Sequence, residues 1–94
     1  MSPQIVNQSV IQFVERIQIQ STHQRKIPVP KKFWKEFPLN ALVKIELMDT
    51  PALFFVDMVQ AQGKVQRKIP VPQKFWDFFA ADTIVTIELM RKTA

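Results

Sequence analysis

The sequence repeats itself once at a spacing of 42 residues, and this repeat limits the folds open to the chain. Residues 24–48 (QRKIPVPKKFWKEFPLNALVKIELM) align without a gap on residues 66–90 (QRKIPVPQKFWDFFAADTIVTIELM), and sixteen of the 25 aligned positions are identical. A weaker match continues upstream, so the repeats run from 10 to 48 and from 52 to 90. The linker 49–51 is too short to separate independent units. We therefore predict that residues 1–94 form a single domain with a pseudo-twofold axis.

Each repeat shows the period-two hydrophobic pattern that is typical of half-buried β-strands. In the first copy the alternating apolar residues are Ile11, Phe13, Ile17 and Ile19. The alternation slips at Glu15 and at the equivalent Asp57, which predicts a β-bulge at both places. The last strand of each repeat is expected over residues 42–48 and 84–90.

Prolines divide each repeat. The Ile-Pro-Val-Pro segments at 27–30 and 69–72 predict strand ends or edges, because proline has no N–H to donate. Pro30 and Pro72 favour the first position of a helix, so short two-turn helices are expected over 31–37 and 73–79. Asn40 and Asp82 are turn formers ahead of the last strands. Because Gly63 is the one glycine, the first hairpin is expected to have a longer loop around residues 21–24.

A strand–strand–helix–strand unit of this size leaves sheet edges open and has too little apolar surface for its own core. Two such units can cover one another's edges. The predicted fold is therefore mainly β with two short helices, in which two ββαβ repeats form a small closed or nearly closed β-barrel.

Three segments carry a resemblance to a known family. The segments Lys-Ile-Pro-Val-Pro (68–72), QKFWDFF (73–79) and TIVTIEL (83–89) resemble the SpoVT/AbrB swapped-hairpin domain, and residues 26–47 resemble it equally. The resemblance implies a pseudo-twofold swapped-hairpin barrel, here from tandem copies in one chain, and membership of a group of DNA-binding regulators and antitoxins. The family's Gly-Arg pair falls on residues 25–26 and 67–68, where the glycine is missing, so the hairpin loop must differ.

The residue inventory argues against catalysis. The chain has no cysteine and one histidine, His23, so no disulfide, catalytic triad or metal-ligand spacing can be assembled. We predict no catalytic residues, no metal site, no cofactor, no small-molecule substrate and no enzymatic activity. The duplicated carboxylates Glu15/Asp57 and Glu46/Glu88 are interpreted as strand salt bridges or solvated side chains in preference to a paired acid site. The absence of cysteine favours a cytoplasmic location, and a DNA-binding function implies association with the nucleoid. The longest apolar run, residues 52–56, argues against a membrane span.

The charge balance favours a polyanionic partner. Lys and Arg total 13 against 8 Asp and Glu, which gives a formal net charge of +5. The first repeat carries 7 − 3 = +4 and the second 4 − 4 = 0. For any single lysine a solvated surface is the better interpretation, but the cluster predicts contacts with DNA phosphates. The candidate residues are Arg25, Lys26, Lys31, Lys32, Lys35, Arg67 and Lys68.

The second repeat is apolar at four positions where the first is polar. These residues, Phe54, Met58, Val65 and Phe78, predict a patch for a protein partner. The alternative, packing against the N-terminal segment Ile5–Val10, has similar weight. Trp34 and Trp76 are duplicated, which favours core packing over base stacking.

Two functions follow from these patterns. The first is a non-enzymatic, AbrB-like DNA-binding protein, a transcription regulator or chromatin-associated factor, that grips duplex DNA through its basic residues. The alternative is an accessory subunit whose apolar patch docks onto a larger DNA-processing enzyme, such as a DNA polymerase in replication.

Overall fold

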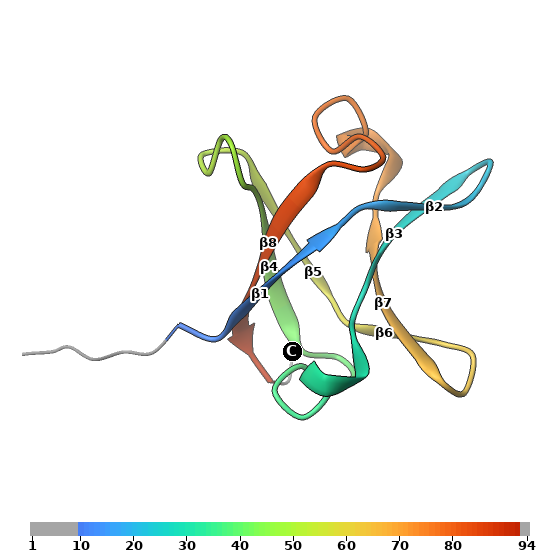
Figure 1. The fold of residues 1–94 in the computed structure, drawn as a ribbon, viewed down its shortest axis with the longest axis vertical. Helices are drawn as coiled ribbons and strands as arrows, with labels where there is room; N and C mark the ends of the chain where they lie inside the picture. The colour runs from blue at the N-terminus through green and yellow to red at the C-terminus, as the bar shows by residue number, and fades with distance from the viewer. Residues whose placement is uncertain (1–9, 93–94) are drawn as a thin grey trace, which may run out of the picture.

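The computed structural model describes residues 10–92 of the chain, and these form a mainly β fold with two antiparallel four-stranded sheets (Figure 1). Sheet A has the strand order β1 (Gln12–Arg16), β8 (Ile84–Arg91), β4 (Leu42–Leu47) and β5 (Phe54–Met58). Sheet B has the order β2 (Gln18–Ser21), β3 (Gln24–Pro28), β7 (Gln66–Val71) and β6 (Gln60–Gln62). No helix within residues 10–92 is long and apolar enough to cross a membrane.

The two repeats are interlaced. Every strand pairing in sheet A, β1 with β8, β8 with β4 and β4 with β5, joins one repeat to the other. In sheet B each repeat contributes its own hairpin, and the two hairpins meet where Ile27 on β3 lies opposite Ile69 on β7. The strands of sheet A therefore cannot keep their hydrogen-bonding partners unless both repeats are present.

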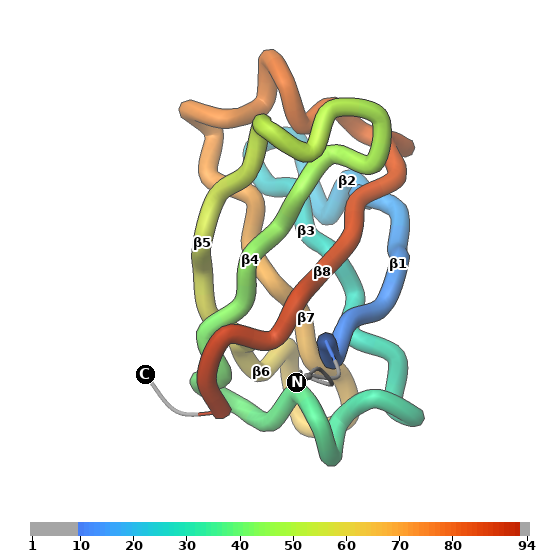
Figure 2. The backbone as a smooth tube through the Cα atoms, turned by 90° about the vertical axis from the view of Figure 1, so that its left-hand side faces the viewer, coloured from blue at the N-terminus to red at the C-terminus, as the bar shows by residue number. Residues whose placement is uncertain are grey.

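One hydrophobic core lies between the two sheets and draws on both repeats. Figure 2 shows β4 and β8 in front of β3 and β7, with the core between these layers. The isoleucine pairs Ile27/Ile69 and Ile45/Ile87 are fully buried. Each such side chain contributes roughly 1.5–3 kcal/mol relative to an exposed one.

Aromatic side chains close both ends of this core with the same geometry. The ring of Phe13 stacks on Phe33 at 4.9 Å between centroids, and Phe55 stacks on Phe75 at 5.0 Å. The partly buried indoles also pack against the core, which confirms the packing role predicted for Trp34 and Trp76. Each indole N–H donates a hydrogen bond to the carbonyl of the valine five residues before it.

The two predicted helices are much shorter than expected. The structure has single 3₁₀ turns, η1 (Lys31–Phe33) and η2 (Gln73–Phe75), in place of helices over 31–37 and 73–79. The segment between the proline and the next turn is only about two helical turns long, and a helix that short gains too few hydrogen bonds to offset nucleation. Asn40 and Asp82 are confirmed as turn formers, because they adopt the left-handed φ values of 70° and 68°.

The sheets do not close into the expected barrel. Instead, each repeat's first long strand crosses from sheet A to sheet B at a buried residue, Ile17 or Val59. The N–H of Ile17 donates to the carbonyl of Thr83 at 3.0 Å, and Ile17 accepts from the N–H of Asp82 at 2.7 Å. Hydrogen bonds to the turn before β8 thus support the crossing at Ile17. Equivalent hydrogen bonds to the turn before β4 support the crossing at Val59.

The bulges predicted at Glu15 and Asp57 are absent from the observed register. β1 pairs without a break from Gln12 to Arg16, and β5 pairs without a break from Phe54 to Met58. Each off-phase carboxylate bends back to its own backbone, since Glu15 accepts from the next N–H at 2.8 Å and Asp57 does the same at 2.7 Å. The hydrophobic alternation therefore breaks because each strand leaves sheet A for sheet B two residues after its carboxylate.

Two local expectations also change. The first hairpin turns through two residues, Thr22 and His23, without the longer loop, and an irregular register between Ile19 and Ser21 accommodates the turn. Pro28 ends β3 as predicted, whereas Pro70 lies inside the central strand β7. Pro70 has no N–H to donate, but no hydrogen bond between strands is lost, because its backbone nitrogen faces the side on which β6 has already ended.

Candidate nucleic-acid interface

Sheet B carries positive charge without negative charge. Its four strands contain Arg25, Lys26, Arg67 and Lys68, four of the seven residues predicted to contact phosphates, and no Asp or Glu. The carboxylates lie in the strands of sheet A and in the connections. An anion that approaches sheet B therefore meets no like charge on its strands.

Two lysines and a set of glutamines form the outer face of sheet B. Lys26 and Lys68 point outward, because the adjacent Ile27 and Ile69 are fully buried. The ammonium of Lys26 donates to Oε1 of Gln62 at 3.0 Å, and that of Lys68 donates to Oε1 of Gln20 at 3.2 Å. These amides position the lysines without neutralising them. Strand alternation places six glutamines on this face: Gln18, Gln20, Gln24, Gln60, Gln62 and Gln66.

The two arginines reach across to the other repeat. The guanidinium of Arg67 lies 4.4 Å from the centroid of the Trp34 ring, and that of Arg25 lies 4.3 Å from the ring of Trp76. Such stacks contribute about 0.5–1 kcal/mol at exposed sites and hold the guanidinium plane in one orientation. Because each indole already has an arginine over its ring, direct stacking of a base on that ring face is blocked.

Most of the cationic residues gather at one end of the molecule, here called the η1 end. Figure 1 shows η1, the β6–β7 turn and the end of β8 together at the bottom of the view. Val65 from that turn lines one cavity with Lys31, and Arg91 on β8 lies opposite Leu42 at the start of β4. The cations of this end are Lys31, Lys32, Lys35, Lys64, Arg67, Arg91 and Lys92, opposed by Glu36 and Asp57, so its net charge is 7 − 2 = +5.

The opposite end, here called the η2 end, has the reverse balance. Its cations are Arg16, Arg25 and Lys74, and its anions are Glu15, Asp49, Asp77 and Asp82, which gives 3 − 4 = −1. The residues between the ends, Lys26, Lys44, Lys68, Glu46 and Glu88, add 3 − 2 = +1. The chain's formal net charge of +5 is thus equalled by the charge of the η1 end alone.

Intramolecular ion pairs do not neutralise this surface. Within residues 10–92 the one salt bridge joins Lys44 to Glu46 at 3.4 Å, on sheet A. The seven predicted phosphate contacts are therefore available to an external anion. Sequence reasoning missed Lys64, Arg91 and Lys92. Lys64 joins the η1 end because Val65 of its turn shares a cavity with Lys31. Arg91 and Lys92 join it because β8 runs antiparallel beside β4.

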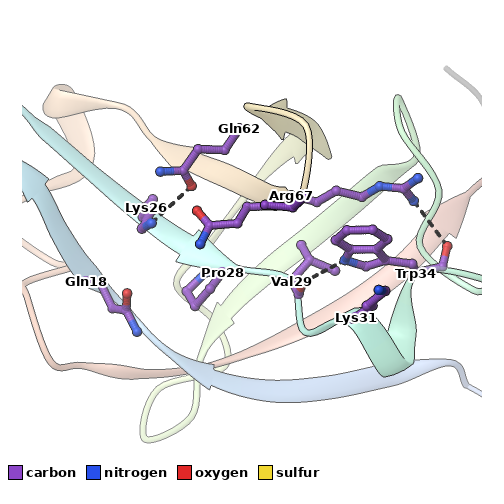
Figure 3. Close-up of a pocket in the computed structure, with 10 residues that line it drawn as sticks. Gln18, Lys26, Pro28, Val29, Lys31, Trp34, Gln62 and Arg67 are labelled. Atoms are coloured by element: carbon purple, nitrogen blue, oxygen red, sulfur yellow. Dashed lines mark hydrogen bonds between the residues drawn. The ribbon is translucent and has the colours of Figure 1, made fainter.

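A cavity of about 260 Å³ lies where the outer face of sheet B meets the η1 end (Figure 3). Three cations line it, Lys26, Lys31 and Arg67, together with amides and the ring of Trp34. None of its lining residues is acidic. The cavity joins the two cationic regions into one continuous surface.

The four residues of the predicted apolar patch do not gather on one surface: two lie at opposite ends of β5, one in the β6–β7 turn and one after η2. Phe78 is 59% exposed and lines a cleft of about 470 Å³ at the η2 end with Met48 and Ile84. Phe54 lies on sheet A beneath the ammonium of Lys44, 4.8 Å from its ring centroid. Met58 is half-buried at the other end of β5, and Val65 lies in the β6–β7 turn. The N-terminal segment proposed to cover them, Ile5–Val10, lies outside the described residues except for Val10.

The duplicated carboxylates do not form paired acid sites. Glu15 and Asp57 lie at opposite ends of the fold, and Glu46 forms the ion pair with Lys44. No group of three His, Cys, Asp or Glu side chains in the described part of the chain is placed to hold a metal ion. His23 is exposed in its turn.

Comparison with known proteins adds no functional information: no protein-family model, curated protein or solved structure matches the chain at a significant level.

Proposed function

We propose that this protein is a non-enzymatic DNA-binding protein that holds the phosphate backbone against the outer face of sheet B and the η1 end. The observation that carries the proposal is the concentration of unpaired cations on one continuous surface, with no salt bridge to any of them within residues 10–92. Phosphate neutralisation by Lys and Arg supplies most of the affinity in non-specific DNA binding.

The surface offers two kinds of contact. Lys26 and Lys68 are related by the pseudo-twofold axis and contact phosphates from the sheet, while Lys31, Lys32 and Lys35 are exposed on or beside η1. The surrounding glutamine amides both donate and accept hydrogen bonds, so they can bind phosphate oxygens or base edges. The expected role is that of a regulator or chromatin-associated factor in the nucleoid.

The interlaced sheet supports a relationship to the SpoVT/AbrB swapped-hairpin fold. In sheet A, strands of the first repeat alternate with strands of the second, as expected when two such units exchange hairpins. The proposal predicts nuclear Overhauser effects between Phe13 on β1 and Ile87 on β8, which lie opposite one another. Contacts confined within each repeat would contradict it.

Salt dependence tests the DNA-binding proposal directly. The binding of a labelled short duplex to the full chain is measured by fluorescence anisotropy at several salt concentrations. Six of the seven predicted contacts lie on this surface, because Arg25 is at the η2 end. Six phosphate contacts predict a slope of log K against log salt of roughly −5, at about 0.9 per phosphate. Replacing Lys31, Lys32 and Lys35 with Gln should reduce the slope by roughly three. Affinity that does not change with salt contradicts the proposal.

The cleft at the η2 end favours a second function, that of an accessory subunit for a larger DNA-processing enzyme such as a DNA polymerase. Phe78, Met48 and Ile84 are 59%, 47% and 40% exposed, and they surround the cleft beside Asp49 and Asp82. Clustered exposed apolar side chains with a polar rim are typical of protein interfaces.

Co-purification from native extract distinguishes the two functions. A stoichiometric protein partner that survives nuclease treatment, and that Phe78→Glu removes, supports the accessory subunit. The matched control is Glu36→Phe, which changes the equivalent position of the other repeat. A partner retained by Phe78→Glu contradicts docking at this cleft.

A further inference from the structure

We propose that the cavity between sheet B and the η1 end binds one nucleotide of an unpaired DNA strand. This inference rests on the proposed function and adds the form of DNA that the protein prefers. The ligand class is a nucleoside phosphate unit, with its phosphate on the lysines and its base on the guanidinium plane of Arg67.

The size of the cavity limits its occupant. Its volume of about 260 Å³ lies just below the range of roughly 300–1,000 Å³ that is typical of sites for drug-sized ligands. A bare phosphate would leave most of this space empty, and a base pair within a duplex cannot enter it. One nucleotide that is free of its complementary strand matches the space.

The charges at the cavity are arranged for a phosphate. Lys26 and Lys31 line it from β3 and η1, and no lining residue is acidic. The hydrogen bond from Lys26 to Gln62, drawn in Figure 3, fixes the ammonium while leaving its charge unneutralised. An ammonium that is already positioned loses less conformational entropy when the anion binds.

Arg67 supplies a stacking platform. One face of its guanidinium lies over Trp34, and Trp34 is itself fixed by the hydrogen bond from its Nε1–H to the carbonyl of Val29 at 2.8 Å. The guanidinium also donates to the carbonyl of Trp34 at 3.4 Å. Arg67 also lines the cavity and is only half-buried, and unpaired bases stack on arginine planes as well as on aromatic rings. The Gln66 amide of the cavity can contact the base edge.

The equivalent place at the η2 end provides an internal control. There, Arg25 stacks on Trp76 with nearly the same geometry, but Gln73 replaces Lys31 and His23 replaces Val65. The phosphate-binding charge and the apolar wall are both reduced. The η1 cavity is therefore expected to bind the nucleotide more tightly than its counterpart.

The first experiment compares a labelled oligothymidylate with a duplex of equal length on the full chain at low salt. The expected result is an affinity for the unpaired strand roughly tenfold above that for the duplex, because a base stacked on the guanidinium adds a contact that a paired base cannot make. Arg67→Lys keeps the charge but removes the plane, so it should abolish this preference, whereas Arg25→Lys should retain it.

The second experiment follows the two indole N–H signals by NMR. Thymidine monophosphate should shift the Trp34 signal more than the Trp76 signal, and inorganic phosphate should shift Trp34 less than the nucleotide does. Lys31→Gln should weaken the response to the nucleotide without unfolding the chain, because Lys31 is exposed. This exposed variant keeps the test decisive if Arg67→Lys proves unstable.

The outcomes separate the inference from the function on which it rests. Equal affinity for the two forms of DNA, or equal responses of Trp34 and Trp76, would overturn the nucleotide site and leave DNA binding intact. No salt-dependent binding to either form would overturn the proposed function itself.

Discussion

The η1 and η2 ends are built from nearly the same sequence and have nearly the same geometry, yet they carry opposite charge. The Trp Nε1 to carbonyl distances are 2.8 and 2.9 Å, and the arginine to indole distances are 4.4 and 4.3 Å. Their net charges are nevertheless 7 − 2 = +5 and 3 − 4 = −1. Residues that the repeats share hold the fold together, whereas residues that differ set the properties of each surface.

Part of the difference lies on and just after the two 3₁₀ turns. Lys31, Lys35 and Glu36 of the first repeat correspond to Gln73, Asp77 and Phe78 of the second. Five of these six residues are exposed, and Glu36 is intermediate. Exposed positions tolerate substitution at little cost to stability, so the two ends can diverge without loss of the shared core.

The largest expected effect is on stability, and it shows whether the two repeats contribute equally to the core. Ile27→Ala and Ile69→Ala each remove a fully buried side chain at symmetric positions of the central strands. Each should lower the free energy of unfolding by about 2–5 kcal/mol, measured by urea denaturation. Values for the pair that differ by more than about 2 kcal/mol, beyond the ordinary variation between sites, would show that one repeat dominates the stability.

The next largest effect is expected when charged residues are exchanged between the two ends. Lys31→Gln with Lys35→Asp gives the η1 end the residues of the η2 end. At a slope of about 0.9 per phosphate, the loss of two contacts should weaken DNA binding roughly 30-fold at physiological salt, measured by anisotropy. The reciprocal variant, Gln73→Lys with Asp77→Lys, is the control at the η2 end, outside the proposed surface, and should change binding far less. A change in affinity of equal size in the two variants would place the DNA elsewhere.

The repeat in the sequence was enough to predict the mainly β fold, the shared core and the packing of Trp34 and Trp76 against it. It was not enough to predict the crossing at Ile17 and Val59, because the phase break marks only that the strand changes its surroundings and not which sheet it joins. Helix length was also overestimated, since Pro30 favours a start but cannot set the number of turns.

The sequence predicted only part of the candidate site, because it shows which charges are close along the chain but not which strands and turns meet. Residues near in sequence to η1 were found, because their charge is visible as a cluster along the chain. Lys64, Arg91 and Lys92 were not found, because only the pairing of Leu42 with Arg91 and the shared cavity of Lys31 with Val65 bring them there. The apolar residues of the second repeat were counted together although their strands and turns point them to different surfaces.

A smaller effect is expected when the hydrogen bonds of the two duplicated indoles are removed. Trp34→Phe and Trp76→Phe each remove an N–H that hydrogen-bonds a valine carbonyl in a partly buried position. Each should cost about 1 kcal/mol of stability. In the first variant Arg67 also lies over a smaller and weaker ring, so Trp34→Phe alone should reduce the preference for an unpaired strand. If Trp76→Phe reduces that preference equally, the two ends are not functionally distinct.

The smallest expected effect is the change in stability on substitution of an exposed residue of the second repeat, compared with a buried neighbour. Phe78 and Phe79 are neighbours in sequence, but Phe78 is 59% exposed and Phe79 only 3% exposed. Phe78→Glu should therefore change the free energy of unfolding by less than about 0.5 kcal/mol, as expected for a surface substitution, whereas Phe79→Ala should cost about 3–5 kcal/mol. Urea denaturation of both variants gives the comparison. A loss above about 1 kcal/mol for Phe78→Glu, twice the ordinary surface effect, would show that Phe78 packs within the fold and that the cleft is not a docking surface.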